Sequence, residues 1–337
     1  MENNKNTEKP LKILYIYRHP DMGYSIGKVF KPIEEEMRKY AEVDSVYLPV
    51  PNYSLYGLWR NIKAARTAIK NKKYDLVHIT GTENYLIPFI KNTKIIVTVH
   101  DVRFFSGNMS YVRVFLKYIL FVLTLKFADI ATFISDKSKD DTYKMINLGN
   151  KSVVINNPVG NEYKYQKKKC KSNCPSILHI GTKPNKNLIR TIDALKGFNC
   201  KLRIVGYVDN ELIQRLNDNH IDYTIVMNLT DEQIVKEYEK CDIVNFPSLE
   251  EGFGMPIIEG QAIGRLVVTS NRLPMSDIAG KGAIIVDPEN VESIRIGYEK
   301  ALKVYDDIVR LGLENVNRFN LKKITENYYA IYRRIIN

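Results

Sequence analysis

Short hydrophobic runs recur along the whole chain, and each is followed by a polar or helix-length stretch. Most runs are continuous in isoleucine, valine, leucine and tyrosine, which is typical of strands buried on both faces of a parallel sheet. Six fall in the first half, at 12–17, 43–48, 74–79, 94–99, 129–134 and 152–155. Six fall in the second half, at 176–180, 201–205, 222–226, 242–246, 266–269 and 283–286. This alternation predicts βαβ units and an α/β fold.

A lysine-rich stretch, residues 164–171, separates the two groups of six strands. The chain has 337 residues, which is enough for about two domains. We therefore predict two Rossmann-like, doubly wound domains that face a central cleft. The N-terminal domain is expected over residues 11–160 and the C-terminal domain over 161–318, after a disordered tail at 1–10.

The composition is that of a soluble globular protein, with 45% apolar and 26% charged residues, and it excludes collagen-like and wholly disordered chains. The polar N-terminus predicts no secretory signal. The most apolar stretch, Tyr111–Ala128, holds only eight consecutive uncharged residues. A bilayer span needs ~20. Four scattered cysteines do not indicate a disulfide framework. We expect a cytoplasmic protein.

The net charge of +12 predicts anionic partners, namely nucleic acid, phosphorylated ligands or an anionic membrane surface. An acid-free basic run from Arg60 to Lys73 carries part of it, and a solvated surface is the more common explanation for such a run. Nucleic acid is not indicated, because aromatic residues do not interleave with the basic clusters and no recognition helix is evident. The stretch 111–128 predicts either a helix packed on the N-terminal sheet or a membrane-surface helix assisted by the basic run. Its residues Arg113, Lys117 and Thr124 would share one helical face.

Small, polar or ionisable residues follow nearly every predicted strand. In doubly wound sheets, ligands bind beyond the carboxyl ends of the strands. The segments at these positions are 18–23, 80–82, 100–101, 135–136, 181–183, 206–207 and 247–248. They predict a cleft lined for ligand binding.

The strongest single signal runs over residues 247–259, where a strand end leads through a glycine loop into a helix. Gly252 and Gly254 let the backbone approach a ligand closely, and the N–H groups at a helix start attract anions. Glu251 and Glu259 flank this loop, so each can accept hydroxyl groups of a sugar.

This segment resembles the Glu–seven residues–Glu motif of the retaining glycosyltransferases of family 4, which have the GT-B fold. Further matches follow in the same order along almost the whole chain, at 74–78, 97–101, 128–139, 154–159, 179–188, 242–246 and 269–280. The resemblance implies two Rossmann-like domains of the GT-B type. It also implies that the last helix, within residues 319–337, packs back on the N-terminal domain.

The resemblance also implies roles for the matching residues. Glu251 would contact the hydroxyls of the transferred sugar, and Glu259 would hold the ribose of the nucleotide. Lys186 would neutralise the diphosphate leaving group, and His100 would contact the sugar near its 6-hydroxyl. The remaining donor-binding residues would be Gly23, Thr182, Lys183, Met227, Leu229, Gly252, Phe253 and Gly254.

Two of the positions that depart from the family pattern belong to the predicted donor site. Many relatives carry an arginine where this chain has Thr182, so that Lys183 would have to supply the missing charge. Many relatives also carry paired glycines in the first loop, where this chain has Gly23 alone.

A metal site is not predicted from the sequence. Cys170 and Cys174 lack a second pair of ligands nearby, and a structural zinc needs four. The acidic doublet at residues 140–141 falls in a predicted helix rather than at a strand end. We therefore expect transfer that needs no metal and no cofactor.

The resemblance implies a retaining hexosyltransferase that uses a nucleotide diphosphosugar and acts in cell-surface polysaccharide or glycolipid synthesis. Its partners would be the donor, a sugar or lipid-linked acceptor, and an anionic membrane surface on the inner face of the cell membrane. Catalysis would rest on leaving-group stabilisation and positioning. Two alternatives stay open: a non-catalytic nucleotide-sugar-binding subunit of a glycosyltransferase complex, and a nucleotide-sugar epimerase of the same fold.

Overall fold

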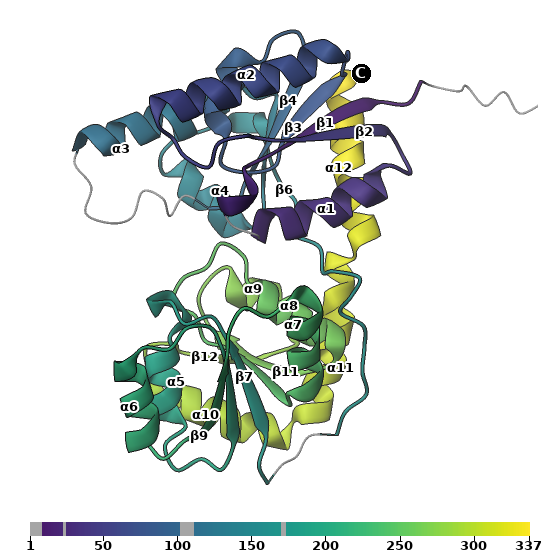
Figure 1. Cartoon of the computed structure of the whole chain (residues 1–337). Helices are drawn as coiled ribbons and strands as arrows, with labels where there is room; N and C mark the ends of the chain where they lie inside the picture. Colours follow the sequence, from purple (N-terminus) through teal and green to yellow (C-terminus); the bar gives the residue numbers. More distant parts are fainter. Residues whose placement is uncertain (1–8, 23–24, 102–110, 170–172) are drawn as a thin grey trace, which may run out of the picture. The chain divides into compact units, whose positions relative to one another are not determined.

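The computed structural model describes residues 9–22, 25–101, 111–169 and 173–337. Gly23, a predicted donor contact, lies outside the described residues, as does Cys170. The chain divides into two compact units, and each is built on its own sheet (Figure 1). Unit 1 comprises residues 1–158 and 321–337, and unit 2 comprises residues 159–320.

Unit 1 contains a parallel six-stranded sheet in the order β2-β1-β3-β4-β5-β6. The central strands are almost completely buried, as their continuous hydrophobic runs predicted. The strands are β1 (Lys12–Tyr17), β2 (Glu42–Tyr47), β3 (Leu76–Ile79), β4 (Lys94–Val99), β5 (Ile130–Phe133) and β6 (Ser152–Val154). The six strands expected in this half are thus confirmed, with ends that differ by at most two residues.

Helices cover both faces of this sheet. Ser54 caps the start of helix α2, because its hydroxyl accepts a hydrogen bond from Gly57 N at 3.0 Å. The helices are α1 (Ser25–Met37), α2 (Leu55–Asn71), α3 (Tyr111–Lys117), α4 (Asp136–Tyr143) and α12 (Leu321–Ile336), with short turns η1 (Pro20–Met22), η2 (Asn84–Phe89) and η6 (Gly149–Lys151).

Helix α12 belongs to unit 1, although it comes last in the chain, and it packs against α1. Its Tyr332 is fully buried, with the hydroxyl 3.0 Å from Tyr15 Oη and 2.6 Å from His78 Nδ1. The second nitrogen of His78 lies 2.8 Å from Thr98 Oγ1. Because both ring nitrogens are engaged inside the core, His78 serves the packing of α12 on the sheet.

The apolar stretch 111–128 does not form one regular helix, which corrects the expectation of a shared polar face. Helix α3 gives way to a π-helical turn, η4 (Tyr118–Val122), and then to a 3₁₀ turn, η5 (Leu123–Phe127). Because α-, π- and 3₁₀-helical segments differ in the number of residues per turn, the spacing of Lys117 and Thr124 no longer fixes a common face. Thr124 is buried and donates to Leu120 O at 2.9 Å.

Unit 2 contains a second parallel six-stranded sheet, in the order β12-β11-β10-β7-β8-β9. Renumbered within the unit, this is the doubly wound order 3-2-1-4-5-6. The strands are β7 (Ser176–Ile180), β8 (Lys201–Val205), β9 (Asp222–Val226), β10 (Ile243–Phe246), β11 (Leu266–Ser270) and β12 (Ile284–Val286). These six strands are confirmed as well, and the predicted pair of Rossmann-like sheets is present.

Each helix of unit 2 connects two strands or follows the last of them. Helix α7 starts with a capping box, in which Thr230 and Gln233 exchange side-chain to backbone hydrogen bonds. The elements are η7 (Pro184–Lys186), α5 (Leu188–Ala194), α6 (Asn210–Asp218), α7 (Asp231–Lys240), α8 (Met255–Ile263), α9 (Met275–Ala279), α10 (Val291–Lys303), α11 (Tyr305–Val316) and η8 (Asn317–Phe319). Within the described part of the chain, no helix combines the length and apolar character that crossing a membrane would need.

Candidate functional site

The strand order of unit 2 reverses between β7 and β10, which are paired neighbours. Ligands of doubly wound sheets bind at the carboxyl ends of strands at such a switch point. The segments that follow these two strands, 181–186 and 247–254, are in direct contact. Leu249 N donates to Asn185 O at 2.8 Å, and Asn185 Nδ2 donates to Glu250 O at 3.1 Å.

Two predicted catalytic residues, Lys186 and Glu251, meet at this point. Lys186 Nζ lies 2.6 Å from Glu251 Oε1 and 4.6 Å from the centre of the Phe246 ring. Asn185 Nδ2 donates to the same carboxylate oxygen at 3.2 Å. The two charged side chains are 21% and 10% exposed, respectively, so their attraction is only partly screened by water. The switch point therefore holds a half-buried ammonium and a carboxylate side by side.

Gly181 makes this position of Lys186 possible. Its φ of +88° is unfavourable for other residues, and an added Cβ would lie 3.2 Å from Lys186 Cγ. The aliphatic stem of the lysine thus crosses the glycine directly. Beside it, Thr182 contacts Gly206, where an added Cβ would lie 3.0 Å from the threonine methyl group. Lys183 is exposed.

The start of helix α8 provides the glycine loop predicted between the two glutamates. Gly254 precedes the helix with a φ of +116°, and an added Cβ would lie 2.9 Å from Ile257 Cδ1. Gly252 is buried, and the Phe253 ring packs edge-on against Phe319 at a centroid distance of 5.8 Å. The phenylalanine side chain is therefore committed to the core, which leaves its backbone for ligand contacts.

Glu259, in the second turn of α8, is held by two tyrosines that the sequence did not single out. Tyr238 donates to Glu259 Oε2 at 2.5 Å, and the Tyr163 ring packs edge-on against Tyr238 at 5.6 Å. Burial, followed by the charge of Glu259, raises the pKa of both phenols well above its usual value. Both hydroxyls therefore stay protonated and able to donate. Nothing in the sequence pairs these positions, because Tyr163 precedes β7, Tyr238 is in α7 and Glu259 is in α8.

Replacing Tyr238 with phenylalanine is expected to raise the KM for the donor about tenfold, which corresponds to ~1.4 kcal/mol, and to change kcat less. The reason is that Glu259 loses the Tyr238 hydroxyl group that fixes the position of its carboxylate. Hydrogen bonds to charged groups contribute about 1.5–3 kcal/mol. Steady-state kinetics at varied donor concentration measures this. The matched control is Tyr223→Phe, which removes a hydroxyl bonded to Asn217. An unchanged KM would contradict a positioning role for Tyr238.

The segment predicted to receive the base follows β9. Met227 is 52% exposed, Leu229 is half-buried, and Asn228 between them has a φ of +54°. Tyr207, which follows the neighbouring strand β8, is 71% exposed and was not among the predicted residues. Because Val205 and Val226 pair in register, Tyr207 and Met227 follow the same edge of the sheet.

His100 lies at the carboxyl edge of the unit 1 sheet, directly after β4. Its Nε2 is 2.9 Å from Thr80 O, and since a carbonyl only accepts, Nε2 carries the hydrogen and Nδ1 is an acceptor. Burial lowers its pKa to about 4, so the ring is neutral at pH 7. The residue can therefore accept a hydrogen bond from a hydroxyl group, as the predicted sugar contact requires.

A buried carboxyl, Glu83, lies on the loop after β3 and was not among the residues predicted from the sequence. Its side chain is 1% exposed, and burial raises its pKa to about 7, while the charge of Arg18 opposes this rise. Tyr53 Oη and Thr82 Oγ1 lie 3.3 Å apart beside it. The loops after β1 and β3 thus bury a carboxyl at the switch point of the unit 1 sheet.

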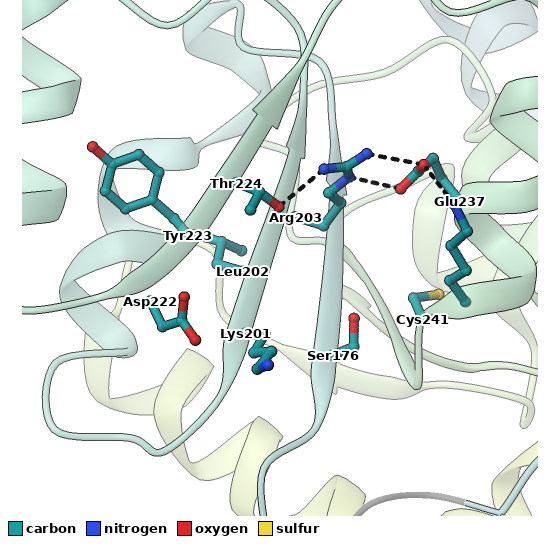
Figure 2. A pocket seen from close by; sticks show the side chains of 10 residues that line it. Ser176, Lys201, Leu202, Arg203, Asp222, Tyr223, Thr224, Glu237 and Cys241 are labelled. Atoms are coloured by element: carbon teal, nitrogen blue, oxygen red, sulfur yellow. Dashed lines mark hydrogen bonds and ion pairs between the residues drawn. The ribbon is translucent and has the colours of Figure 1, made fainter.

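Unit 2 also has a hollow of about 340 Å³ at the opposite edge of its sheet, near the amino ends of β7, β8 and β9. Figure 2 shows that its central pair is Arg203 and Glu237, joined by two hydrogen bonds of 2.7 and 3.0 Å. Arg203 also donates to Thr224 Oγ1 at 3.1 Å. This hollow lies at the amino ends of the strands, far from the switch point, and its two charged side chains are already paired with each other. It is therefore not the predicted donor site.

Metal ligands do not gather in the described residues. Across these ranges, no group of three or more histidine, cysteine, aspartate or glutamate side chains could hold a metal ion. Cys174 is a free, half-exposed cysteine.

Comparison with known proteins identifies both halves of the chain. The family described as "Glycosyltransferase Family 4" matches residues 28–162, and "Glycosyl transferases group 1" matches residues 164–312. The O-antigen chain mannosyltransferase RfbU of Salmonella typhimurium is 27% identical over 291 residues, which are 82% of this chain and 78% of that protein.

Solved structures show the same fold. Sucrose-phosphate synthase from Thermosynechococcus elongatus superposes with a TM-score of 0.82 at 14% identity, over 96% of this chain and 99% of that one. HepE of Anabaena in complex with UDP gives 0.76 at 16% identity, over 96% and 100%. The chain therefore belongs to the glycosyltransferases of the family 4 type and has the GT-B fold that the resemblance implied.

Proposed function

We propose that this glycosyltransferase moves a hexosyl group, in particular a mannosyl group, from a nucleotide diphosphosugar to an acceptor hydroxyl with retention of configuration. The observation that carries the proposal is the pairing of Lys186 with Glu251 at the switch point of unit 2. The mannosyl group is suggested by RfbU, whose name assigns it to O-antigen chain synthesis. Cell-surface polysaccharide or glycolipid synthesis is the matching process.

The donor would span the carboxyl edge of the unit 2 sheet. The nucleotide base would lie against Met227 and Leu229, and the ribose against Glu259. The diphosphate would then reach Lys186, with Thr182, Lys183 and the backbone of residues 252–254 around it. HepE supports this donor class, since its structure was solved in complex with UDP.

Catalysis would depend on stabilising the leaving group. The bond from the sugar C1 to the diphosphate oxygen breaks, its electron pair stays on the diphosphate, and the Lys186 ammonium neutralises that growing charge. The acceptor oxygen bonds to C1, and its proton passes to the departing phosphate oxygen. Glu251 would position the sugar hydroxyls, while His100 and Gly23 would contribute from unit 1. We expect this transfer to need no metal and no cofactor.

Thermal-shift measurements with a panel of nucleotide sugars test the donor assignment. A true donor at 100 times its dissociation constant should stabilise the protein by roughly 2.7 kcal/mol. Among the donors, a nucleotide diphosphomannose is expected to give the largest shift, and donor hydrolysis without acceptor should follow. Binding without hydrolysis or transfer would favour the non-catalytic subunit, and interconversion of the free nucleotide sugar would favour an epimerase.

A further inference from the structure

Helix α2 presents large apolar side chains to solvent rather than to the core. Leu55 is 88% exposed and Trp59 is 54% exposed, and Tyr56 between them is exposed as well. The buried residues of this helix are Gly57, Asn61 and Ala65, which are small or polar. The helix therefore packs on unit 1 through its smaller residues and leaves its most hydrophobic ones outside. None of these side chains has a role in the proposed transfer reaction.

Four cations share this surface. Arg60, Lys63, Arg66 and Lys70 are exposed, and none of them forms an ion pair with a described residue. The sequence places no acidic residue between positions 44 and 75. By contrast, Lys72 at the end of the helix is paired with Asp44 at 2.7 Å. We call Leu55, Tyr56, Trp59, Arg60, Lys63, Arg66 and Lys70 the α2 face.

Two cations of the α2 face each lie over an aromatic ring that precedes the basic run in the sequence. Lys63 Nζ lies 5.2 Å from the centre of the Trp59 ring, and the Arg60 guanidinium lies 5.8 Å from the centre of the Tyr56 ring. These contacts hold the charged groups next to exposed apolar surface. The α2 face therefore combines positive charge and exposed apolar surface within the same pairs of side chains.

A hollow of about 430 Å³ opens beside α2, against Phe89 of η2. Its cationic lining comes from Lys63, Arg66 and Lys70, and its apolar lining comes from Trp59, Ile62 and Phe89, with no carboxylate. Turn η2 contacts both α2 and the η4–η5 segment. Further exposed apolar residues continue along α3, η4 and η5, namely Val114, Phe115, Leu116, Ile119 and Phe127.

We propose that the α2 face docks onto an anionic lipid bilayer, with lipid phosphate groups between Lys63, Arg66 and Lys70. Unpaired cations are attracted to anionic leaflets, and aromatic residues favour the interface between headgroups and hydrocarbon. The exposed leucine and the apolar residues of α3 and η4 suit hydrocarbon better than nucleobases. This assigns the leading role to α2 rather than to the stretch 111–128. The proposal rests on this surface and does not depend on the sugar transferred.

Vesicle flotation of the full chain tests the proposal. The protein is expected to float with phosphatidylcholine vesicles containing roughly one third phosphatidylglycerol, to remain unbound with pure phosphatidylcholine, and to dissociate at high salt. The triple variant Lys63→Glu, Arg66→Glu, Lys70→Glu should lower the bound fraction at least tenfold. Leu55→Ser with Trp59→Ser, which leaves the charge unchanged, should also weaken binding.

The control triple Lys196→Glu, Lys236→Glu, Lys300→Glu changes the charge equally on exposed lysines of unit 2 and should still bind. Equal losses in both triples would overturn the proposal, because net charge alone would then explain binding. Release by inorganic phosphate at matched ionic strength would also overturn it, in favour of a soluble anion site. So would tight binding of a short single-stranded oligonucleotide at this face without vesicle binding. Thermal shifts with nucleotide sugars should be the same for all variants, which separates this surface from the donor site.

Discussion

Replacing Lys186 with alanine is expected to lower the turnover number of the transfer reaction by about 10²–10³-fold, as is typical when one preorganised charge contact is lost. Negative charge grows on the diphosphate as the glycosidic bond breaks, so an ammonium at this point stabilises the transition state more than the bound donor. The lysine is fixed for this role by its contacts with Glu251, Phe246 and Gly181. Kinetics at saturating donor measures the effect.

Two further variants sharpen this test. Lys186→Arg keeps the charge and should retain more activity than the alanine variant, whereas Lys196→Ala removes an exposed lysine of the same unit and should leave turnover unchanged. Thermal unfolding shows whether the variants are folded, since the alanine change also leaves the Glu251 carboxylate without its cation. If the turnover number of Lys186→Ala falls by less than tenfold, another residue neutralises the diphosphate, and Lys183 is the first to examine.

Replacing Arg265 with methionine is expected to lower the free energy of unfolding of unit 2 by roughly 3–5 kcal/mol. Arg265 is 2% exposed and donates five hydrogen bonds of 2.8–3.2 Å to backbone carbonyls. The acceptors are the carbonyl oxygens of Gln166, Tyr238, Glu239, Ile263 and Gly264. Methionine fills a similar volume but leaves these buried carbonyls without their donor.

Differential scanning calorimetry of the wild type and the variant measures this loss. Arg265→Lys should recover only part of it, because one ammonium cannot reproduce the planar fork of a guanidinium. Arg310→Met is the control, since its ion pair with Glu314 is exposed and should contribute well under about 1 kcal/mol. A loss below about 1 kcal/mol for Arg265→Met would show that water replaces the guanidinium.

The same variant links stability to the donor site. Arg265 binds the carbonyl of Tyr238, the residue that holds Glu259, and the carbonyl of Gln166 in the segment entering unit 2. We therefore expect Arg265→Met to weaken donor binding as well, even at a temperature where the protein remains folded.

Much of the fold could be predicted from the sequence because its signals are local. A continuous hydrophobic run such as 94–99 is stable only when it is buried on both faces, which requires a parallel sheet with helices on either side. The glycine loop over residues 247–259 is also a local signal. The backbone before α8 has a positive φ at Gly254, a conformation that glycine adopts readily and other residues rarely do. Most candidate residues of the predicted donor site were visible for the same reason, because they lie in the loops that follow strand ends.

The stretch 111–128 shows where local signals fail. Its apolar composition predicts a helix but not the change to π and 3₁₀ turns, which arises as Phe121 and Leu125 enter the unit 1 core. The exposure of Trp59 on α2 likewise could not be predicted from the pattern of hydrophobic and polar residues, because an apolar residue on an amphipathic helix usually faces the core.

By itself, the sequence determined the class of fold, the strands found in the described residues and the chemical character of each strand end. Only the tertiary structure decided which of these ends meet. Lys186 and Glu251 come within 2.6 Å because β7 and β10 are neighbours in the sheet, and that order depends on contacts between residues far apart in the chain. The partners of Glu259, the burial of Glu83 and the carbonyls around Arg265 were decided in the same way. Burial and long-range hydrogen bonds are properties of the packed chain, so they leave no local pattern in the sequence.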